Sequence, residues 1–478
     1  MGDSSDILGG PQPAAKSEAA QVEQIAAPPD DRAAHRTPEG WRRSDGLASL
    51  PEAFRTIPIV HTAPWWRKML AFAGPGYLVA VGYMDPGNWA TSLAGGSRFG
   101  YTLLSVILLS NIMAMFLQAL SAKLGIVTGR DLAQACRDHF SKPVSIVLWF
   151  LCEIAIVACD LAEVLGSAIA LQLLFGIPLF WGVLITAADV LIILALQSRG
   201  FRLIEAIVIA LIATIGGCFA YEIFFARPIW LEAAHGWVPT LEIIRNPAML
   251  YIAIGILGAT VMPHNLYLHS SIVQTRAFGR EQENKRDAVK YAVIDSTIAL
   301  FFALFINAAI LVLGAAAFHT RGMGHVAELS EAYHLLTPVL GASFASVLFA
   351  VALLCSGQNS TLTGTLAGQI VMEGFLSIRL PPWLRRLITR LIAIVPAAIV
   401  VGVMGEHQAT NLLILSQVVL SMQLPFAVIP LVMFTSNKEK MGAFVNRPLT
   451  VAIAWFMAFA ILALNIELLR QVFTAWLS

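Results

Sequence analysis

Two motifs of the same form, X-Pro-x-Asn, lie deep in otherwise apolar sequence: Asp85-Pro86-Gly87-Asn88 and Met262-Pro263-His264-Asn265. Proline removes a backbone donor and clashes with the preceding turn, so each motif should unwind a helix and free carbonyls near Gly82 and Ala259. Asp85 and Asn88 add oxygen ligands, and Met262 adds a thioether. Because a thioether favours the softer late first-row ions over Mg²⁺ and Ca²⁺, this set predicts a site for Mn²⁺, Fe²⁺, Co²⁺ or Cd²⁺, with Met262 as the selectivity filter.

Each motif taken alone also has an ordinary structural explanation. Asp-Pro is common where helices end, so Asp85 could be a turn residue. Met262 could fill a gap in a packed core. A carboxylate inside a membrane span is expensive and usually functional, and a second motif at the matching place argues against coincidence. We therefore interpret both residues as ligands.

A second group of polar residues suggests a path for protons. Asp160 and Glu163 lie three residues apart, which puts them on one face of a helix. Arg390 belongs to a later predicted span and is expected opposite the two acids, where it could pair with them or leave when the protein changes state. The alternative is a static ion pair that fixes helix packing.

His264 and His269 frame the second motif, and either could accept or relay a proton released as the metal arrives. A zinc-binding pair is the weaker alternative, because five residues place the two rings about 140° apart on a regular helix and no HExxH motif accompanies them. Gln417, next to Ser416, either completes the coordination shell or hydrogen-bonds between helices, and the sequence leaves both interpretations open.

The elements that must position these residues are membrane helices. The 478 residues are 57% apolar and only 13% charged, a composition that excludes a typical soluble globular protein. The net charge of +1 gives no reason to expect nucleic acid as a partner. The five cysteines form no CxxC pair, so free thiols are expected rather than a disulfide framework or a structural zinc site.

Hydropathy predicts an all-α membrane protein with eleven transmembrane helices. They cover residues 72–97, 101–123, 144–172, 178–197, 203–226, 247–274, 290–318, 333–357, 387–405, 409–434 and 449–472. Eighteen lysines and arginines fall in one set of loops and five in the other, which predicts a cytoplasmic amino terminus and a carboxyl terminus outside. Residues 1–65 are rich in Ala, Pro and charge, and are predicted to be a disordered cytoplasmic tail.

The two motifs interrupt the first and the sixth span. Interrupted spans at equivalent positions of two five-helix halves indicate a transporter built from inverted repeats, with its substrate held between the breaks. The first repeat is predicted over residues 66–226 and the second over 247–434, which leaves 449–472 as a peripheral eleventh helix.

At both breaks the sequence resembles the Nramp family of divalent-metal transporters, also called natural-resistance-associated macrophage proteins, and the bacterial manganese transporters in particular. The resemblance covers about residues 66 to 472. It extends to Asp160-Leu161-Ala162-Glu163, to residues 264–270, to the run Gly357–Gln369 and to Ser416-Gln417-Val418-Val419-Leu420.

The resemblance implies a leucine-transporter-like fold and import of Mn²⁺ or Fe²⁺ by alternating access with proton symport. It further implies metal binding by Asp85, Asn88, Met262 and the Ala259 carbonyl, joined by Gln417 in some states. Proton movement would involve five residues: Asp85, His264, Asp160, Glu163 and Arg390. Gly82 stands where relatives often have alanine, which should matter little if only its carbonyl is used. Eukaryotic members commonly have twelve spans, so a bacterial plasma membrane fits better.

Three other functions remain to be weighed. A cation-coupled amino-acid carrier of the same architecture also uses broken helices, but it would not need a carboxylate and a thioether facing each other. An ion channel would need repeated rings of carbonyls or charges, which are not found. An enzyme would need a nucleophile with its base or a closed metal triad, and neither is present. No cofactor and no obligatory protein partner is predicted, only metal ion, proton and lipid bilayer.

Overall fold

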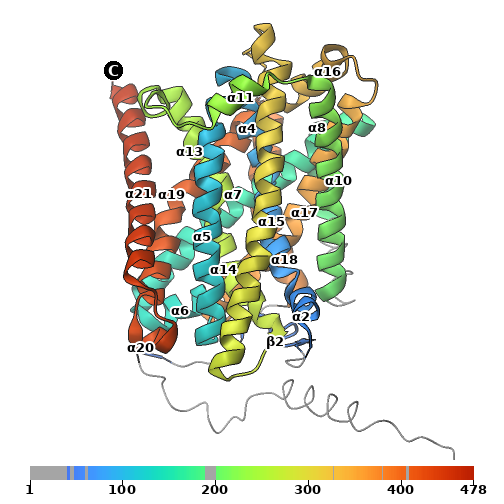
Figure 1. The fold of residues 1–478 in the computed structure, drawn as a ribbon. Helices are drawn as coiled ribbons and strands as arrows, with labels where there is room; N and C mark the ends of the chain where they lie inside the picture. Colours follow the sequence, from blue (N-terminus) through green and yellow to red (C-terminus); the bar gives the residue numbers. More distant parts are fainter. Residues whose placement is uncertain are drawn as a thin grey trace, which may run out of the picture.

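The computed structural model describes residues 40–43, 48–59, 63–188, 201–326, 328–378, 381–404 and 408–477. These residues form a bundle of helices that run roughly parallel to one another (Figure 1). Eight spans in the described chain are long and apolar enough to cross a membrane. They are built from α5 (Leu104–Thr128), α7 (Lys142–Phe175), α10 (Phe201–Ala226), α13 (Pro247–Val261) with α14 (Pro263–Ile272), α15 (Gln282–Ala317), α17 (Ala345–Leu376), α19 (Ala409–Thr435) and α21 (Pro448–Leu477).

The other three predicted spans correspond to shorter or interrupted helices. The first is divided into α3 (Pro75–Gly82) and α4 (Pro86–Phe99). The fourth begins as α8 (Leu179–Ile185) and η2 (Thr186–Ala188), and its remainder lies outside the described residues. The ninth is α18 (Pro382–Met404), whose apolar stretch is shorter. The total of eleven membrane crossings therefore stays a prediction.

One predicted span was wrong in position. Residues 333–357 do not form one helix: α16 (Leu329–Leu340) ends at Gly341, and α17 runs from Ala345 to Leu376. Averaged hydropathy missed the second half of α17 because it is rich in Ser, Thr, Gln and Gly, which face the interior of the bundle. Asn359, which lies just beyond the predicted span 333–357, is accordingly buried near the middle of α17.

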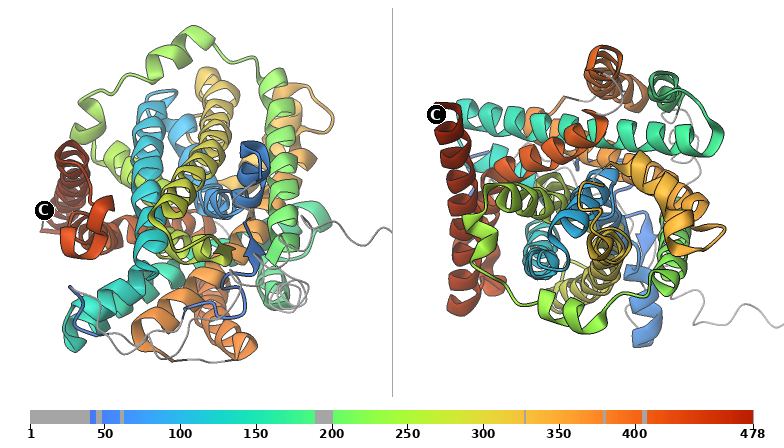
Figure 2. Two further views of the ribbon diagram at one scale, coloured as in Figure 1. Left: turned by 60° about the horizontal axis from the view of Figure 1, so that its bottom comes forward. Right: turned by 90° about the horizontal axis from the view of Figure 1, so that it is seen from above.

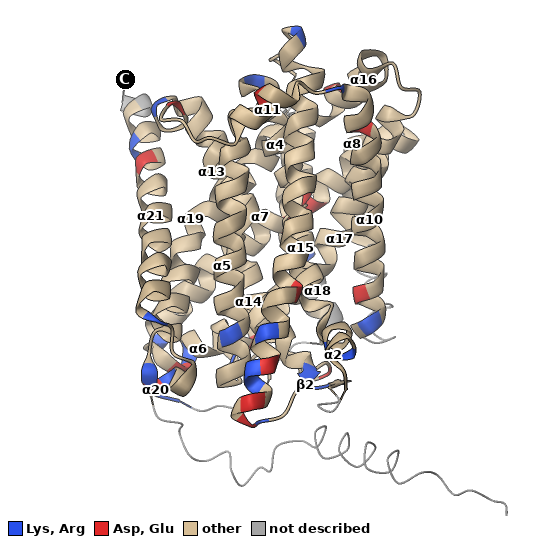
Figure 3. Cartoon of the chain, in the orientation of Figure 1, with Lys and Arg blue, Asp and Glu red and all other residues tan. Residues whose placement is uncertain are grey.

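The short elements lie at the two ends of the bundle. One end holds α2 (Trp65–Phe72), α6 (Leu132–His139), α20 (Lys438–Met441), η6 (Gly442–Phe444) and a two-stranded sheet of β1 (Ile57–Pro58) and β2 (Arg276–Ala277). Lysines and arginines gather there, so we call it the basic end (Figure 3). The opposite end holds α11 (Trp230–Gly236), α12 (Glu242–Arg245), α16 and the last turns of α21 (Figure 1).

The described residues before α2 cross the basic end in contact with it, although the sequence predicted a disordered tail over 1–65. We call residues 40–43 and 48–59 the N-terminal strap. Trp41 is buried against the Phe434 ring, with Lys440 and Arg130 over its own ring. Farther along, β1 pairs in parallel with β2, with Ile57 opposite Arg276. Residues 1–39 of the predicted tail lie outside the described residues.

The broken helices lie inside the bundle. In the views of Figure 2, α21 stands at one edge and the pair α8 and α18 at another, while α3, α4 and α14 lie between the long helices. The side chains of α14 are all buried, including polar ones. The interior thus contains the two segments whose backbone bonding is interrupted, which is where membrane proteins tolerate such segments.

Candidate metal site and neighbouring polar networks

The first break lies between α3 and α4, which residues 83–85 connect. Pro86 occupies the first turn of α4, where its missing N–H is not needed. Asp85 caps this helix: its carboxylate accepts hydrogen bonds from the backbone N–H groups of Asn88 (2.9 Å) and Gly87 (3.3 Å). Asp85 is also fully buried. The helix-end explanation and the buried-carboxylate explanation therefore both apply to it.

The side chain of Asn88 leaves one oxygen available. Its Nδ2 donates to the Tyr83 carbonyl at 2.5 Å. Its Oδ1 is buried and has no hydrogen-bond partner in the described structure. Leaving a buried acceptor unpaired is unfavourable by roughly 1–3 kcal/mol, and a cation would relieve that deficit.

The second break is centred on Met262, between α13 and α14. Its backbone has φ 36° and ψ 102°, a region that residues other than glycine rarely occupy. The side chain is fully buried and packs beside Cys159 of α7 and Leu420 of α19. Pro263 follows immediately and cannot donate to the carbonyl of Ala259, so that carbonyl lacks its usual helical partner. The sequence predicted this loss.

The two breaks are in contact. A Cβ atom at Gly82 would lie 3.1 Å from Met262 Sδ and 2.2 Å from Asn265 Nδ2. The Tyr83 hydroxyl donates to the Val261 carbonyl at 3.4 Å. The two breaks approach this closely because Gly82 has no side chain. Alanine there would require Asn265 to move, so the expectation that this position matters little was wrong for this conformation. The Gly82 carbonyl itself accepts the N–H of Asp85 at 3.2 Å, so it is not free in this conformation.

Gln417 of α19 lies against the first motif and against α13 one turn before Met262. Its Nε2 donates to Asp85 Oδ2 at 3.0 Å, while its Oε1 is buried without a partner in the described chain. A Cβ at Gly87 would lie 1.7 Å from Gln417 Nε2, and one at Gly258 would lie 2.0 Å from the Gln417 carbonyl. Gln417 thus makes the interhelical hydrogen bond and also keeps an oxygen available for coordination.

The resulting donor set is mixed. No three His, Cys, Asp or Glu side chains in the described part of the chain are close enough to hold a metal ion together. The candidate ligands are instead one carboxylate (Asp85), amide oxygens of Asn88 and Gln417, the Ala259 carbonyl and the thioether of Met262. A set with a single formal charge suits a cation that must be released again, and its sulfur suits late first-row ions.

Asp160 and Glu163, the acid pair predicted from the sequence, lie beside Arg390. Arg390 Nη1 lies 3.4 Å from Glu163 Oε2, and Ser360 donates to Glu163 Oε1 at 2.8 Å. A Cβ at Gly364 of α17 would lie 2.8 Å from Glu163 Oε1 and 3.4 Å from Asp160 Oδ1. The two carboxylates therefore lie together against α17, and α18 supplies the arginine.

Cys159 connects the acid pair to the metal site. Its thiol lies 3.6 Å from Glu163 Oε1, within the longer range of a sulfur hydrogen bond. Its side chain also packs in the same small cluster as Met262. All five cysteines are free, as the sequence predicted.

The two histidines have different surroundings. His264 is buried, and its Nδ1 has no partner within the described residues. His269 Nδ1 lies 3.0 Å from Gln118 Oε1, and Gln118 Nε2 donates to the Tyr83 hydroxyl at 2.8 Å. His269 is thereby linked through Gln118 and Tyr83 to the contact between the breaks. Sequence reasoning missed both intermediates, although a glutamine inside the apolar span 101–123 was a usable signal.

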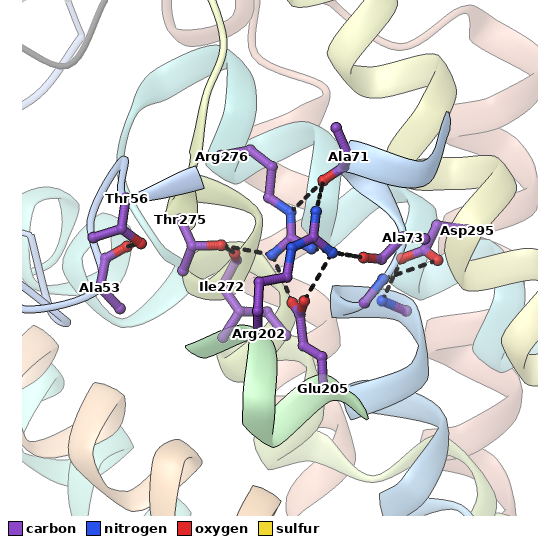
Figure 4. A network of polar contacts seen from close by, with 12 residues as sticks. Ala53, Thr56, Ala71, Ala73, Arg202, Glu205, Ile272, Thr275, Arg276 and Asp295 are labelled. Atoms are coloured by element: carbon purple, nitrogen blue, oxygen red, sulfur yellow. Dashed lines mark hydrogen bonds and ion pairs between the residues drawn. The ribbon is translucent and has the colours of Figure 1, made fainter. Parts of the chain in front are cut away.

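A second polar network, also missed, fastens α2 and α3 at the basic end (Figure 4). Arg276 is fully buried; its guanidinium lies 2.7 Å from Glu205 Oε1 and donates to the carbonyls of Ala71 (3.2 Å) and Ala73 (2.8 Å). Arg202 contacts the other oxygen of Glu205 at 3.0 Å. Two arginines thus hold the last turn of α2 against α10 and β2.

Asp295 of α15 completes this network from the other side. It accepts the backbone N–H groups of Gly76 (2.7 Å) and Gly74 (3.3 Å), which open α3. Gly74 has φ 138°, and a Cβ there would lie 2.3 Å from the Glu205 carboxylate. We call Arg202, Glu205, Arg276 and Asp295 the inner latch, because together they tie the start of the first broken helix to three other elements.

The sequence of the chain is similar to those of divalent-metal transporters. The family model described as natural resistance-associated macrophage protein-like matches residues 76–471. A divalent metal cation transporter of Nostoc sp. is 64% identical over 429 residues, which cover 90% of this chain and 97% of that protein. Another, of Bradyrhizobium diazoefficiens, is 62% identical over 433 residues, which cover 90% and 96%.

Solved structures place the same arrangement of helices in other transporters. A manganese transporter of Eremococcus coleocola is 43% identical with a TM-score of 0.81, covering 89% of this chain and 92% of that one. MhsT in complex with L-phenylalanine superposes with a TM-score of 0.57 at 13% identity, covering 82% and 98%, which shows a shared fold only. The predicted fold class, an all-helical membrane protein of leucine-transporter-like architecture, is confirmed.

Proposed function

The chain belongs to the natural resistance-associated macrophage protein (Nramp) family, whose members are divalent-metal transporters, and from that premise we propose that it imports Mn²⁺, Fe²⁺ or a similar ion together with protons. The observation that carries the proposal is the contact between the two breaks. Gln417 Nε2 donates to Asp85 Oδ2, and Met262 Sδ lies against Gly82, three residues before Asp85. The amide oxygens of Asn88 and Gln417 are buried without partners in the described chain, so oxygen acceptors and the thioether come from the same contact region.

The proposed selectivity comes from Met262. A thioether contributes little to Ca²⁺ or Mg²⁺ binding but adds affinity for softer ions, so the sulfur discriminates where oxygen ligands alone would not. The strained backbone of Met262 supports this role, because strain kept at one residue of a buried break is a common mark of a functional position.

The proposed proton route passes from the metal site to the acid pair. Cys159 belongs to the same apolar cluster as Met262 and lies 3.6 Å from Glu163 Oε1, and Glu163 pairs with Arg390. A cation that binds at Asp85 would favour the ionised form of the Asp85 carboxylate. A proton held by Asp85 would then be released toward Asp160 and Glu163. His264 and His269 are the other candidates for accepting a proton, because both are buried at the second break.

The proposed orientation puts the basic end in the cytoplasm and the carboxyl terminus outside a bacterial plasma membrane. The supporting observation is the concentration of Lys and Arg at that end (Figure 3), which is the bias that sets membrane topology. In this orientation the inner latch closes the cytoplasmic side. Alternating access would then require α2 and α3 to separate from Glu205, Arg276 and Asp295.

Uptake of Mn²⁺ and of Ca²⁺ into proteoliposomes, compared between the parent and Met262→Ala, tests the proposal. We expect the variant to lose much of its discrimination against Ca²⁺, because only oxygen ligands remain. Met249→Ala is the matched control, since Met249 is also buried on α13 but lies far from the break. Unchanged discrimination in Met262→Ala would refute the thioether filter. Uptake that neither saturates nor responds to a proton gradient would refute a proton-coupled carrier.

A further inference from the structure

A pocket of about 390 Å³ opens at the basic end, apart from the metal site. It lies between the lower parts of α5 and α15 and the segment that leads through η6 into α21. Figure 1 shows the lower ends of α5 and α15 next to each other, with α20 and the start of α21 beside them. Neither the metal ligands nor the inner latch line this pocket.

The wall of the pocket is apolar along the two spans. Phe116 and Leu120 come from α5, and Val289 and Val293 come from α15. Within each helix these pairs are four residues apart, so each pair forms one ridge directed at the pocket. Since both helices are membrane spans, this wall continues toward the hydrocarbon region and suits an acyl chain.

The mouth of the pocket is cationic. Lys123, at the end of α5, and the exposed Arg447, just before α21, both line it. Lys123 Nζ donates to Asn446 Oδ1 at 2.7 Å, while Asn446 Nδ2 is buried and has no partner in the described structure. None of the described residues that line the pocket is acidic. Two cations and the unpaired Asn446 amide donor thus line a pocket whose other wall is apolar.

We propose that this pocket binds an anionic phospholipid of the cytoplasmic leaflet. Its phosphate would lie between Lys123 and Arg447 and accept the free Asn446 Nδ2–H, and one acyl chain would run along Phe116, Leu120, Val289 and Val293. Basic pockets between helices on the cytoplasmic side are typical of such lipid headgroups. A free phosphate ion would leave the apolar wall uncovered, and the headgroup of a zwitterionic lipid would bring a third cation toward Lys123 and Arg447.

Native mass spectrometry of the purified full-length protein tests the proposal, with phosphatidylglycerol and phosphatidylcholine offered in equal amounts. We expect preferential retention of phosphatidylglycerol. Arg447→Gln and Lys123→Gln should each reduce that retention about five-fold, the factor expected for one cation near a charged membrane surface. Lys142→Gln is the matched control, because Lys142 is an exposed cation at the same end, on α7, and does not line the pocket.

A second variant tests the acyl-chain wall with both cations intact. Ala119 of α5 also lines the pocket, and Ala119→Phe should fill it and reduce phosphatidylglycerol retention as well. Arg447 is exposed, so Arg447→Gln remains informative even if Lys123→Gln, which loses its bond to Asn446, fails to fold. Thermal midpoints measured with inorganic phosphate and with phosphatidylglycerol separate the two sources of phosphate, and only the lipid should raise the midpoint.

Four results would overturn the proposal. The first is equal retention of the two lipids, and the second is an equal loss in Lys142→Gln. The third is a rise in thermal midpoint with inorganic phosphate as large as with the lipid. The fourth is unchanged retention in both Arg447→Gln and Ala119→Phe.

Discussion

In the proposed orientation and alternating-access mechanism, removing the guanidinium of Arg276 should open the cytoplasmic side of the protein. Arg276 is fully buried and makes the shorter of the two ion pairs with Glu205, besides holding the carbonyls of Ala71 and Ala73. These contacts join α2, α10 and β2, which must separate if α3 is to move away. Arg276→Gln therefore weakens the closed state more than an open one.

The size of the effect follows from burial. Breaking a buried ion pair by removing one partner is unfavourable by about 3–5 kcal/mol. Because Arg202 still contacts the other oxygen of Glu205, we take the lower figure, ~3 kcal/mol, which shifts the equilibrium between closed and open states by roughly 150-fold. Arg202 has a side chain that is 47% exposed, so Arg202→Gln should change the equilibrium by at most ~1 kcal/mol, or about five-fold.

Alkylation of a single reporter cysteine measures this equilibrium. Ala80 of α3 is fully buried, so Ala80→Cys, in a background with the five native cysteines replaced, should react slowly from the cytoplasmic side of inside-out vesicles. Adding Arg276→Gln should raise the rate strongly, and adding Arg202→Gln only slightly. Equal rates for the two arginine variants, or no increase for either, would show that the inner latch does not hold the cytoplasmic side closed.

Three further predictions concern other contacts. Gln417→Ala removes a donor to Asp85 and a candidate ligand, so Mn²⁺ affinity measured by calorimetry should fall about ten-fold, and an unchanged affinity would contradict its place in the site. Burial raises the pKa of Asp131, the N-cap of α6, from 3.8 to about 6, so the folded chain holds the Asp131 proton more tightly than the unfolded chain does. The stabilisation of the folded state by this proton is complete below about pH 4 and is lost as pH rises through about 6. Asp131→Asn keeps the cap, so thermal midpoints across that range should depend less on pH than those of the parent, and parallel curves would contradict the assignment. Trp41→Ala should lower the free energy of unfolding by about 3 kcal/mol, because the Trp41 side chain is only 8% exposed. Denaturant titration of the variant and the parent measures this change, and no difference between them would show that the N-terminal strap is not packed against the protein.

The sequence predicted the breaks because a repeated proline motif marks them chemically. Pro86 and Pro263 cannot donate a helical hydrogen bond wherever they lie. Prolines alone do not mark a break, because α16, α18 and α19 continue through prolines of their own, so the repeated X-Pro-x-Asn form was the informative signal. Asp160 and Glu163 were equally visible, since helical spacing alone puts them on one face. Local chemistry was sufficient for both predictions.

The inner latch could not be assembled from the sequence in the same way. Glu205, Arg276 and Asp295 each look like an isolated charge in or beside an apolar segment, and only the packing of α10, β2 and α15 brings them together. The N-terminal strap illustrates the same difficulty, because its buried apolar residues are scattered and follow no helical or strand period: Trp41, Leu50, Ala53, Ile57 and Ile59. Glu205 and Arg276 are 71 residues apart and Gly74 and Asp295 are 221 apart, and contacts at such separations are invisible to any window along the chain.

The left-handed backbone at Met262 has a consequence for protein engineering. Glycine would adopt φ 36° without strain and relieve on the order of 1–3 kcal/mol, but it would also remove a fully buried side chain, which is unfavourable by about 2–5 kcal/mol. A library selected only for heat resistance would therefore keep an apolar side chain of similar volume at this residue, and leucine supplies that volume without the sulfur. Screens for more thermostable variants of this protein should therefore measure metal discrimination as well as the melting temperature.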